Sequence, residues 1–107
     1  MLDLYYNGKI KVRNEIKDNL GAIITVDEQI YDARIEDENR LIQNAEGEEV
    51  YSNSFVMTDP GIDIDYTSKV YLLEKDGIPH PLASKKLAIM KLLPISSFIA
   101  NHTEIIL

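Results

Sequence analysis

The side chains that could support nucleophilic or acid–base chemistry are few in this chain. It has two histidines, His80 and His102, and no cysteine. Ser84 lies close to His80 in the sequence, but a Ser–His–Asp triad needs spatial convergence and a strained nucleophile turn, and no motif signals either. His80 stands between Pro79 and Pro81, which predicts a loop. We therefore expect no hydrolytic site and no enzymatic activity.

Carboxylates are the commonest candidate ligands. Asp63-x-Asp65, close to Asp59, has the start of a calcium loop, but the later bidentate Glu and the central Gly of that motif are missing. Alternating solvent-facing carboxylates are the simpler interpretation. Two further groups could bind a cation if the fold brought them together: Glu36, Asp37 and Glu38, and Glu46, Glu48 and Glu49. A solvated, mutually repelling loop tip is the favoured interpretation of these, so we predict no metal site and no cofactor.

The charge balance bears on possible partners. The net charge is −7, from 18 acidic and 11 basic residues, and the five glycines are scattered singly rather than forming a phosphate-binding loop. Binding to nucleic acid needs clustered Lys and Arg. The nearest approach to a cluster is Lys9, Lys11, Arg13 and Lys17, which we interpret as a solvated strand face. We expect no specific affinity for nucleic acid, whereas an acidic wall that DNA passes without adhering fits the charge.

The composition is typical of a folded protein, and we expect one domain over residues 1–107. Hydrophobic residues make up 45% and charged residues 27% of the chain, which is too apolar for intrinsic disorder. The lack of cysteine excludes disulfides and zinc–thiolate sites. The first residues predict a polar-interrupted strand rather than a signal peptide, and no apolar run could span a bilayer. We therefore expect a soluble protein that is made inside the cell.

Short runs of β-branched residues and Tyr, separated by Gly, Asn, Asp and Pro, predict an all-β domain. Asn7-Gly8 is a strong hairpin signal and predicts that Leu2–Tyr6 pairs with Lys9–Asn14. An apolar run, Ala22–Val26, comes next, and Gln29–Glu36 then alternates as a half-buried strand does. The residues expected on its buried face are Tyr31, Ala33 and Ile35.

The next predicted pair of strands is Arg40–Gln43 and Val50–Met57, joined by an acidic turn at Asn44–Glu48. Gly47 can adopt the positive φ that a tight connection needs. The second strand alternates in polarity along its length. Its expected faces are Tyr51, Phe55 and Met57 on one side, and Ser52 and Ser54 on the other.

The remaining chain predicts further strands. Asp59-Pro-Gly61 is typical of a turn, and the residues from Ile62 to Tyr66 alternate as in a strand. Lys69–Glu74 predicts a strand that ends at Asp76-Gly77. Thr103–Leu107 predicts a final strand, with Ile105 and Leu107 buried.

The segment Leu82–Leu93 is compatible with two structures. Its leucines, lysines and methionine are good helix formers, and its alternation equally suits strand positions leading to Pro94. We expect a short turn of helix at Ser84–Lys86 followed by a strand. The predicted fold is thus mainly antiparallel all-β, a small β-barrel or sandwich with a long projecting hairpin.

The order of these segments resembles a known family. The relevant strings are Ala33-Arg-Ile-Glu36, Asn39-Arg-Leu-Ile-Gln-Asn44, Glu46-Gly-Glu-Glu-Val-Tyr-Ser52, Ile62-Asp-Ile-Asp65, Lys69-Val-Tyr-Leu-Leu73, Asp76-Gly77 and His102-Thr-Glu-Ile-Ile-Leu107. Together they resemble the minor capsid or head–tail connector proteins of tailed bacteriophages and prophages, and more narrowly the head-completion, stopper-type proteins. The resemblance covers the chain from about Gln29 onward. Ser84–Phe98 departs from it, being longer and more apolar than the expected connection.

The resemblance implies a homo-oligomeric, hexameric ring in the neck of the virion, made in the bacterial cytoplasm. Such a ring lies between the portal or adaptor protein and a tail terminator or tail-tube protein, and gates the DNA channel. The loop that would reach the channel or a neighbouring subunit corresponds to Asn39–Ser52. Its residues of interest are Arg40, Leu41, Ile42, Glu46, Gly47, Glu48 and Glu49, with Tyr51 and Phe55 as aromatic anchors.

Two other functions are open from the sequence. One is a neighbouring neck or tail-completion protein of the same virion. The other is a soluble, non-viral β-barrel that binds another protein. For a ring, packing several acidic loops around an axis costs repulsion unless salt, cations or partner Lys and Arg compensate it.

Overall fold

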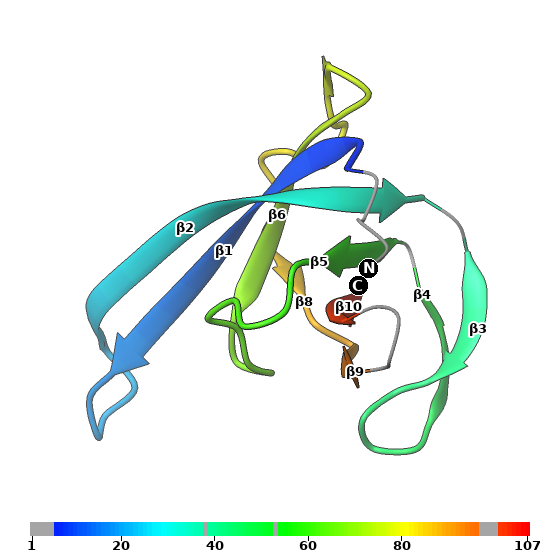
Figure 1. Cartoon of the computed structure of the whole chain (residues 1–107). Helices are drawn as coiled ribbons and strands as arrows, with labels where there is room; N and C mark the ends of the chain where they lie inside the picture. Colours follow the sequence, from blue (N-terminus) through cyan, green and yellow to red (C-terminus); the bar gives the residue numbers. More distant parts are fainter. Residues whose placement is uncertain (1–5, 38, 53, 97–100) are drawn as a thin grey trace.

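The computed structural model describes residues 6–37, 39–52, 54–96 and 101–107. These residues form an eight-stranded sheet and a separate two-stranded hairpin, and every strand pair is antiparallel (Figure 1). None of them is helical. The strands are β1 Gly8–Lys17, β2 Ile23–Glu36, β3 Arg40–Gln43, β4 Glu49–Ser52, β5 Phe55–Thr58, β6 Lys69–Lys75, β7 Ile78–Pro79, β8 Leu87–Ala88, β9 Lys91–Ser96 and β10 Asn101–Ile106. The predicted all-β, mainly antiparallel class is confirmed.

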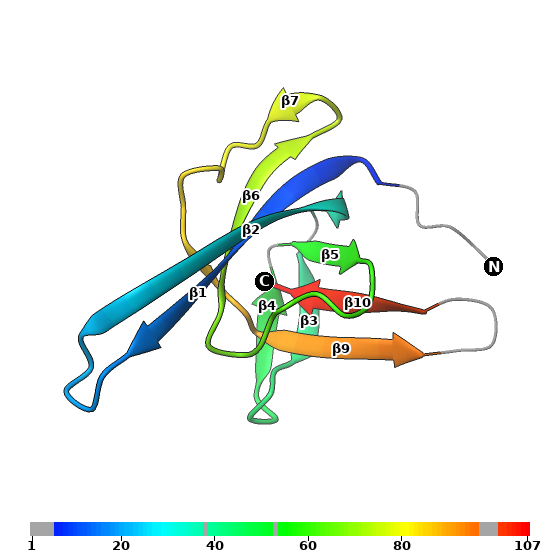
Figure 2. The ribbon, with the colours of Figure 1, turned by 60° about the vertical axis from the view of Figure 1, so that its left-hand side comes forward.

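The long strand β2 determines the shape of the main sheet. It pairs with β1 from Ile23 to Ala33 and with β5 over its last three residues, in the sheet order β7-β6-β1-β2-β5-β10-β9, with β8 also on β6. The strands on either side of β2 therefore lie over one another and enclose the core (Figure 2). Its fully buried residues include Ile10, Val12, Ala33, Ile35, Val56, Val70, Leu72 and Ile105.

The sheet does not close into a barrel, so the barrel alternative of the predicted fold is wrong and a sandwich-like arrangement describes it better. The edge strand β9 shows why closure is blocked. The N–H of Leu92 donates to the Tyr66 hydroxyl at 3.0 Å, and that hydroxyl lies 3.3 Å from the Leu92 carbonyl. Pro94, in the same strand, has no N–H to offer. Tyr66 therefore occupies the position that a further strand would need.

The prediction of a hairpin at Asn7-Gly8 is wrong for the residues that the structure describes. Both edges of Gly8–Arg13 are occupied, by β2 on one side and β6 on the other. The Asn7 side chain instead bonds the backbone of Ile35, accepting from its N–H at 2.7 Å and donating to its carbonyl at 3.0 Å. A Cβ at Gly8 would lie 2.2 Å from the carbonyl oxygen of Glu74, so glycine permits the close approach of β6. The other half of that predicted hairpin, 2–5, lies outside the described residues.

Other strand predictions need smaller corrections. Val50–Met57 is two strands, because β4 belongs to the hairpin while β5 enters the main sheet. The segment Ile62–Tyr66 is a loop, although Ile62 and Ile64 do pack against the core. Ser84–Lys86 is not helical. Ser84 belongs instead to a non-helical turn over residues 81–84, in which the N–H of Ala83 bonds the His80 carbonyl and the N–H of Lys85 bonds the Leu82 carbonyl, each at 3.0 Å.

Three predictions are confirmed. The alternation of Gln29–Glu36 buries Ala33 and Ile35 and half-buries Tyr31. The strand β6 ends at the Asp76-Gly77 turn, where both residues have positive φ, 54° and 78°. The last strand, β10, is followed by Leu107, whose N–H and carbonyl both bond Ser54.

Candidate functional site

The predicted hairpin exists, and its turn is firmly held. β3 pairs with β4 from Arg40↔Ser52 to Gln43↔Glu49. Across the turn, the Asn44 side-chain oxygen accepts from the N–H of Glu46 at 3.1 Å and of Glu48 at 2.9 Å. Gly47 has a φ of 86°, as predicted. The backbone of the acidic turn is therefore held in place, and its carboxylates are exposed.

The two faces of this hairpin differ from the prediction. Leu41 and Tyr51 are directly paired and are 56% and 68% exposed, so Tyr51 does not anchor the hairpin in the core. Its neighbour Ser52 is buried instead, because that side of β4 is the one turned inward. Phe55, the other predicted anchor, is half-buried in β5. Ile42 is half-buried, while Glu46, Gly47, Glu48 and Glu49 are exposed. For Arg40 the strand position alone is described.

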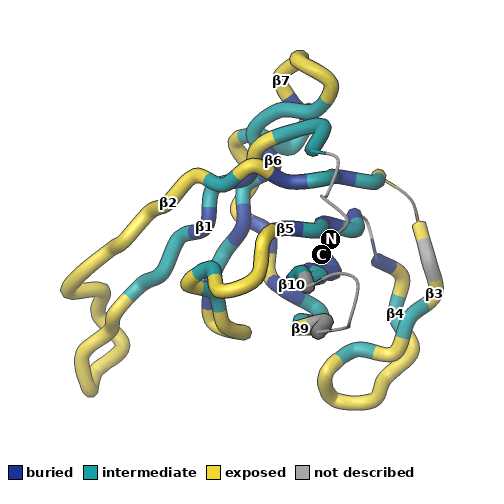
Figure 3. The backbone as a smooth tube through the Cα atoms, viewed as in Figure 1, coloured by how far each residue is buried: buried dark blue, intermediate teal, exposed yellow. Residues whose placement is uncertain are grey.

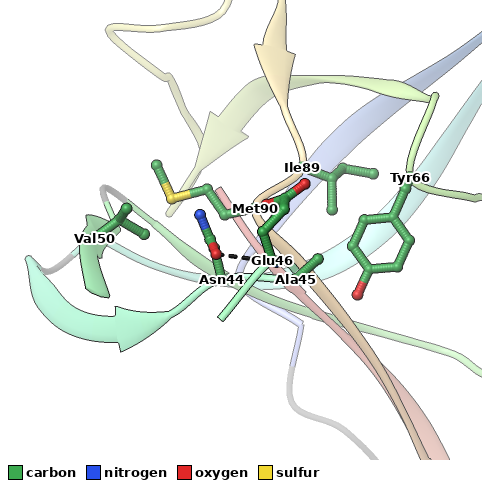
Figure 4. A pocket seen from close by; sticks show the side chains of 7 residues that line it. All are labelled: Asn44, Ala45, Glu46, Val50, Tyr66, Ile89 and Met90. Carbon is green, nitrogen blue, oxygen red and sulfur yellow. Dashed lines mark hydrogen bonds between the residues drawn. The ribbon is translucent and has the colours of Figure 1, made fainter. Parts of the chain in front are cut away.

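The turn of the hairpin rests against the main sheet. The N–H of Ala45 donates to the Met90 carbonyl at 3.3 Å. A hollow of about 290 Å³ lies at this junction, lined by Asn44, Ala45, Glu46, Val50, Tyr66, Ile89 and Met90 (Figure 4). Glu46 lines this hollow, whereas Glu48 and Glu49 lie outside it. Nothing in its lining other than Glu46 carries charge, and the hollow shows no pair of groups suited to acid–base chemistry.

The most prominent projection is the far part of the β1–β2 hairpin, which we call the arm (residues 14–28). The sequence predicted a projecting hairpin with its turn at Asn44–Glu48 and did not reveal this one. Figure 3 shows the arm exposed along β2 and around its tip. At the tip, the Asp18 carboxylate accepts from the N–H groups of Leu20 and Ala22 at 2.8 and 3.0 Å. Exposed apolar residues on or next to the arm are Ile16, Leu20, Ile23, Ile24, Val26 and Ile30.

The outer face of the arm base carries a basic surface that the sequence did not reveal. Alternation places Lys11, Arg13 and Lys17 on the face of β1 opposite the buried Ile10 and Val12. The register of β1 with β6 sets Lys69 beside Arg13. The basic residues between Lys9 and Lys17 were the only sign of this surface in the sequence. Lys69 joins them because β6 pairs with β1, and the sequence spacing does not show that pairing.

One carboxylate lies among these cations. Glu15 accepts from Arg13 Nε at 2.8 Å and from Lys86 Nζ at 3.0 Å, and its side chain is 9% exposed. The hydrogen bonds from Arg13 and Lys86 lower the pKa of Glu15. A hollow of about 440 Å³ opens beside it, lined by Glu15, Lys17, Thr67 and Lys69. We call this the basic hollow.

Lys17 and Lys69 have no ion-pair partner among the residues that the structure describes. Nearby, Lys11 and Arg13 share Glu28, at 3.2 and 3.7 Å. With Lys86, five cations lie in or beside the basic hollow, together with the carboxylates of Glu15 and Glu28 and that of Asp65, which is bonded to Thr67 of the lining. In a chain of net charge −7, this concentrates positive charge on one face.

A second polar cluster joins three parts of the chain at Asp37. Its carboxylate accepts from the Ser54 hydroxyl at 2.8 Å and lies 2.9 Å from His80 Nε2 and 3.4 Å from Lys75 Nζ. Burial raises the pKa of Asp37, but the hydrogen bonds from Ser54 and His80 and the nearby positive charge outweigh this, so the net pKa is lowered.

This cluster contains Ser, His and Asp but not in the order that nucleophilic catalysis needs. The serine hydroxyl donates to the aspartate rather than to the histidine. The other histidine nitrogen, Nδ1, accepts from the N–H of Leu82 at 3.0 Å. Both nitrogens of the imidazole are therefore engaged, and Ser54 has no base. The cluster is suited to fixing the His80 loop against β5.

Two other candidate residues from the sequence, Asp65 and His102, bond to side chains or backbone groups close to them in the chain. Asp65 accepts from the N–H and hydroxyl of Thr67, which lowers its pKa. His102 Nε2 lies 3.0 Å from Glu104 within β10. Among the described residues, no group of three His, Cys, Asp or Glu is arranged to hold a metal ion. In the same part of the chain, no helix has the length and apolar character that crossing a membrane requires.

Comparison with protein-family models, curated proteins and solved structures gave no match. The role of the chain must therefore be inferred from its own surfaces.

Proposed function

We propose that this chain is a structural, non-enzymatic assembly protein that works in contact with copies of itself and with neighbouring proteins. The observation that carries the proposal is a pair of hairpins with exposed apolar side chains: the arm, which projects, and β3–β4, whose turn is bonded to Met90. The arm and the β3–β4 hairpin leave the main sheet at different sides (Figure 1), and each presents exposed apolar side chains. Exposed apolar groups gathered on projections are typical of interaction surfaces.

The edge of β2 supports the same proposal. From Ile23 to Ala33, β2 pairs with β1 alone among the described strands. Long unpaired edges bind further strands readily, and proteins usually protect them. The edge of β9 is protected by Tyr66 and Pro94, whereas that of β2 is open and carries the exposed Ile24, Val26 and Ile30.

More specifically, we propose the role that the family resemblance implies, a ring in the neck of a tailed bacteriophage virion between the portal or adaptor and the tail. The β3–β4 hairpin corresponds to the loop assigned to the channel or to the neighbouring subunit. Its fixed acidic turn would neither bind DNA nor adhere to it, because like charges repel. A neighbouring neck or tail-completion protein is the second candidate, and it shares the same surfaces.

The test is an affinity purification from cells that carry the genetic element encoding the chain. The tag belongs at the N-terminus, because Leu107 is buried and bonded to Ser54. We expect portal, adaptor or tail proteins among the partners identified by mass spectrometry. The variant Glu46→Lys/Glu48→Lys/Glu49→Lys should change their recovery. Recovery of a cellular protein alone, with no virion component, would contradict the neck proposal and favour the soluble binding module.

A further inference from the structure

This molecule has two charged surfaces of opposite sign. The basic hollow is lined by Glu15 and Lys17 of the arm and by Thr67 and Lys69 at the start of β6. The acidic turn closes the β3–β4 hairpin, and the N–H of Ala45 bonds it to Met90. No ion pair joins the two surfaces within the described chain, so their charges are available to another copy.

We propose that the acidic turn of one copy, through Glu48 and Glu49, docks into the basic hollow of the next copy, where Lys17 and Lys69 receive it. The inference rests on the assembly of copies proposed above and names the contact within it. Glu48 and Glu49 are exposed, and neither has an ion-pair partner in the described chain. Lys17 and Lys69 are likewise unpaired within it, so each surface supplies what the other lacks.

The shapes of the two surfaces also agree. The turn is held by the Asn44 side chain, which limits the entropy that docking would cost. The hollow, of about 440 Å³, is open enough to admit carboxylate side chains. Glu15 does not fill it with negative charge, because Arg13 and Lys86 already neutralise that carboxylate.

Apolar groups lie beside both charged surfaces. Val26 and Ile30 pair with Glu15 and Lys11 on the outer face of the β1–β2 hairpin, and they are 39% and 61% exposed. Leu41 and Tyr51 are exposed on the hairpin. A contact that joins the charged surfaces could cover these side chains as well, which would add hydrophobic stabilisation to the electrostatic attraction.

Such a contact is heterologous, since one copy gives its hairpin and the next gives its arm. Heterologous contacts generate rings when the rotation between copies closes. The contact also removes the difficulty of acidic loops crowded around an axis, because each loop would meet lysines of its neighbour.

The test uses reciprocal charge reversal and sedimentation velocity at low ionic strength. Wild-type protein should self-associate with rising concentration, and added salt should weaken the association. Lys17→Glu/Lys69→Glu should weaken it by about tenfold or more, and Glu48→Lys/Glu49→Lys by a similar factor, because each variant opposes like charges. An equimolar mixture of the two variants should associate again, since each then meets a complementary surface. The control Lys85→Glu changes an exposed lysine that lines neither the basic hollow nor the hollow at the acidic turn, and it should behave as wild type.

Carbodiimide cross-linking of mixed isotopically labelled and unlabelled protein supplies a second readout. We expect intermolecular links from Lys17 or Lys69 to Glu48 or Glu49. Wild-type protein that stays monomeric, or variants that associate as well as wild type, would overturn the proposal. So would binding of a short DNA duplex that is lost in Lys17→Glu/Lys69→Glu, because the hollow would then be a phosphate site. Sedimentation and cross-linking test the contact between copies, whereas the affinity purification tests the role in the neck. Either proposal can therefore be refuted without refuting the other.

Discussion

The two halves of the β1–β2 hairpin share one strand pair but have different surroundings. In the half from Gly8 to Val12, β6 covers the second edge of β1, and Ile10 and Val12 are fully buried. In the half beyond Asn14, the same alternation continues to Ile16, which is 56% exposed. The alternation of apolar residues thus sets which side chains share a face, whereas the neighbouring strands determine whether that face becomes core.

The largest difference between the halves should appear in core truncations. Leu72 of β6 is fully buried opposite Ile10, and Leu72→Ala should lower the free energy of unfolding by about 2–5 kcal/mol, because a cavity remains. Ile24→Ala, in the arm, should change it by less than about 0.5 kcal/mol. Urea denaturation measures both. Equal losses in the two variants would show that Ile24 is packed as tightly as Leu72 and that the arm belongs to the core.

Glycines at the two ends of the hairpin offer a second comparison. Gly8→Ala puts a Cβ 2.2 Å from the Glu74 carbonyl oxygen and should cost about 1–3 kcal/mol through strain on β6. Gly21→Ala meets no atom within 4 Å, but a φ of 85° costs alanine about 1–2 kcal/mol. Thermal unfolding of Gly21→Asn, which tolerates that φ better, is the control. It should recover part of the loss, and a failure to do so would refute the conformational explanation.

The cluster around Asp37, just after the end of β2, predicts that the free energy of unfolding depends on pH. The folded pKa of Asp37 lies below its ordinary value of 3.8, so the unfolded chain takes up protons first. The stabilisation is complete above that ordinary value and is lost as the pH falls through the lower folded pKa. Asp37→Asn should cost about 1 kcal/mol at neutral pH, since the carboxylate is partly exposed. It should also flatten the decline of the unfolding free energy in acid. An unchanged acid profile would exclude Asp37 as its source.

The smallest effect on stability should come from the outer face of the β1–β2 hairpin. Val26→Thr/Ile30→Thr removes exposed apolar surface without touching the core, so the free energy of unfolding should stay within about 0.5 kcal/mol of wild type. Self-association, measured by sedimentation, should nevertheless weaken. A variant that unfolds as wild type does and also associates as wild type does would remove this face from the interface.

Local patterns predicted much of the fold. The alternation at Tyr31, Ala33 and Ile35, the Asp76-Gly77 turn and the terminal strand all follow from period and turn chemistry, and the structure has them. The Asn7-Gly8 signal misled because Asn7 serves as a side-chain bridge to Ile35, and that role depends on a strand far along the sequence.

The surfaces were harder to predict than the strands. For β4, an aromatic was expected inside and a serine outside, yet Ser52 is buried and Tyr51 exposed. Alternation placed Tyr51 and Ser52 on opposite faces of β4, but which face is turned inward depends on how the hairpin lies on the rest of the molecule, and spacing along the strand does not show that. The basic hollow needs Lys17 and Lys69 to be close, which depends on β6 pairing with β1 rather than on any spacing in the sequence.

Hydrogen exchange on the two halves of the β1–β2 hairpin tests the central claim, that the arm is an assembly surface, most directly. The chain would be compared dilute at moderate salt and concentrated at low salt. We predict that amides from Thr25 to Ile30 and around the acidic turn gain protection in the associated sample, while those of Gly8–Val12 and Ala33–Ile35 stay equally protected in both. Unchanged exchange along the arm and the turn, in a sample shown by sedimentation to be associated, would contradict the account.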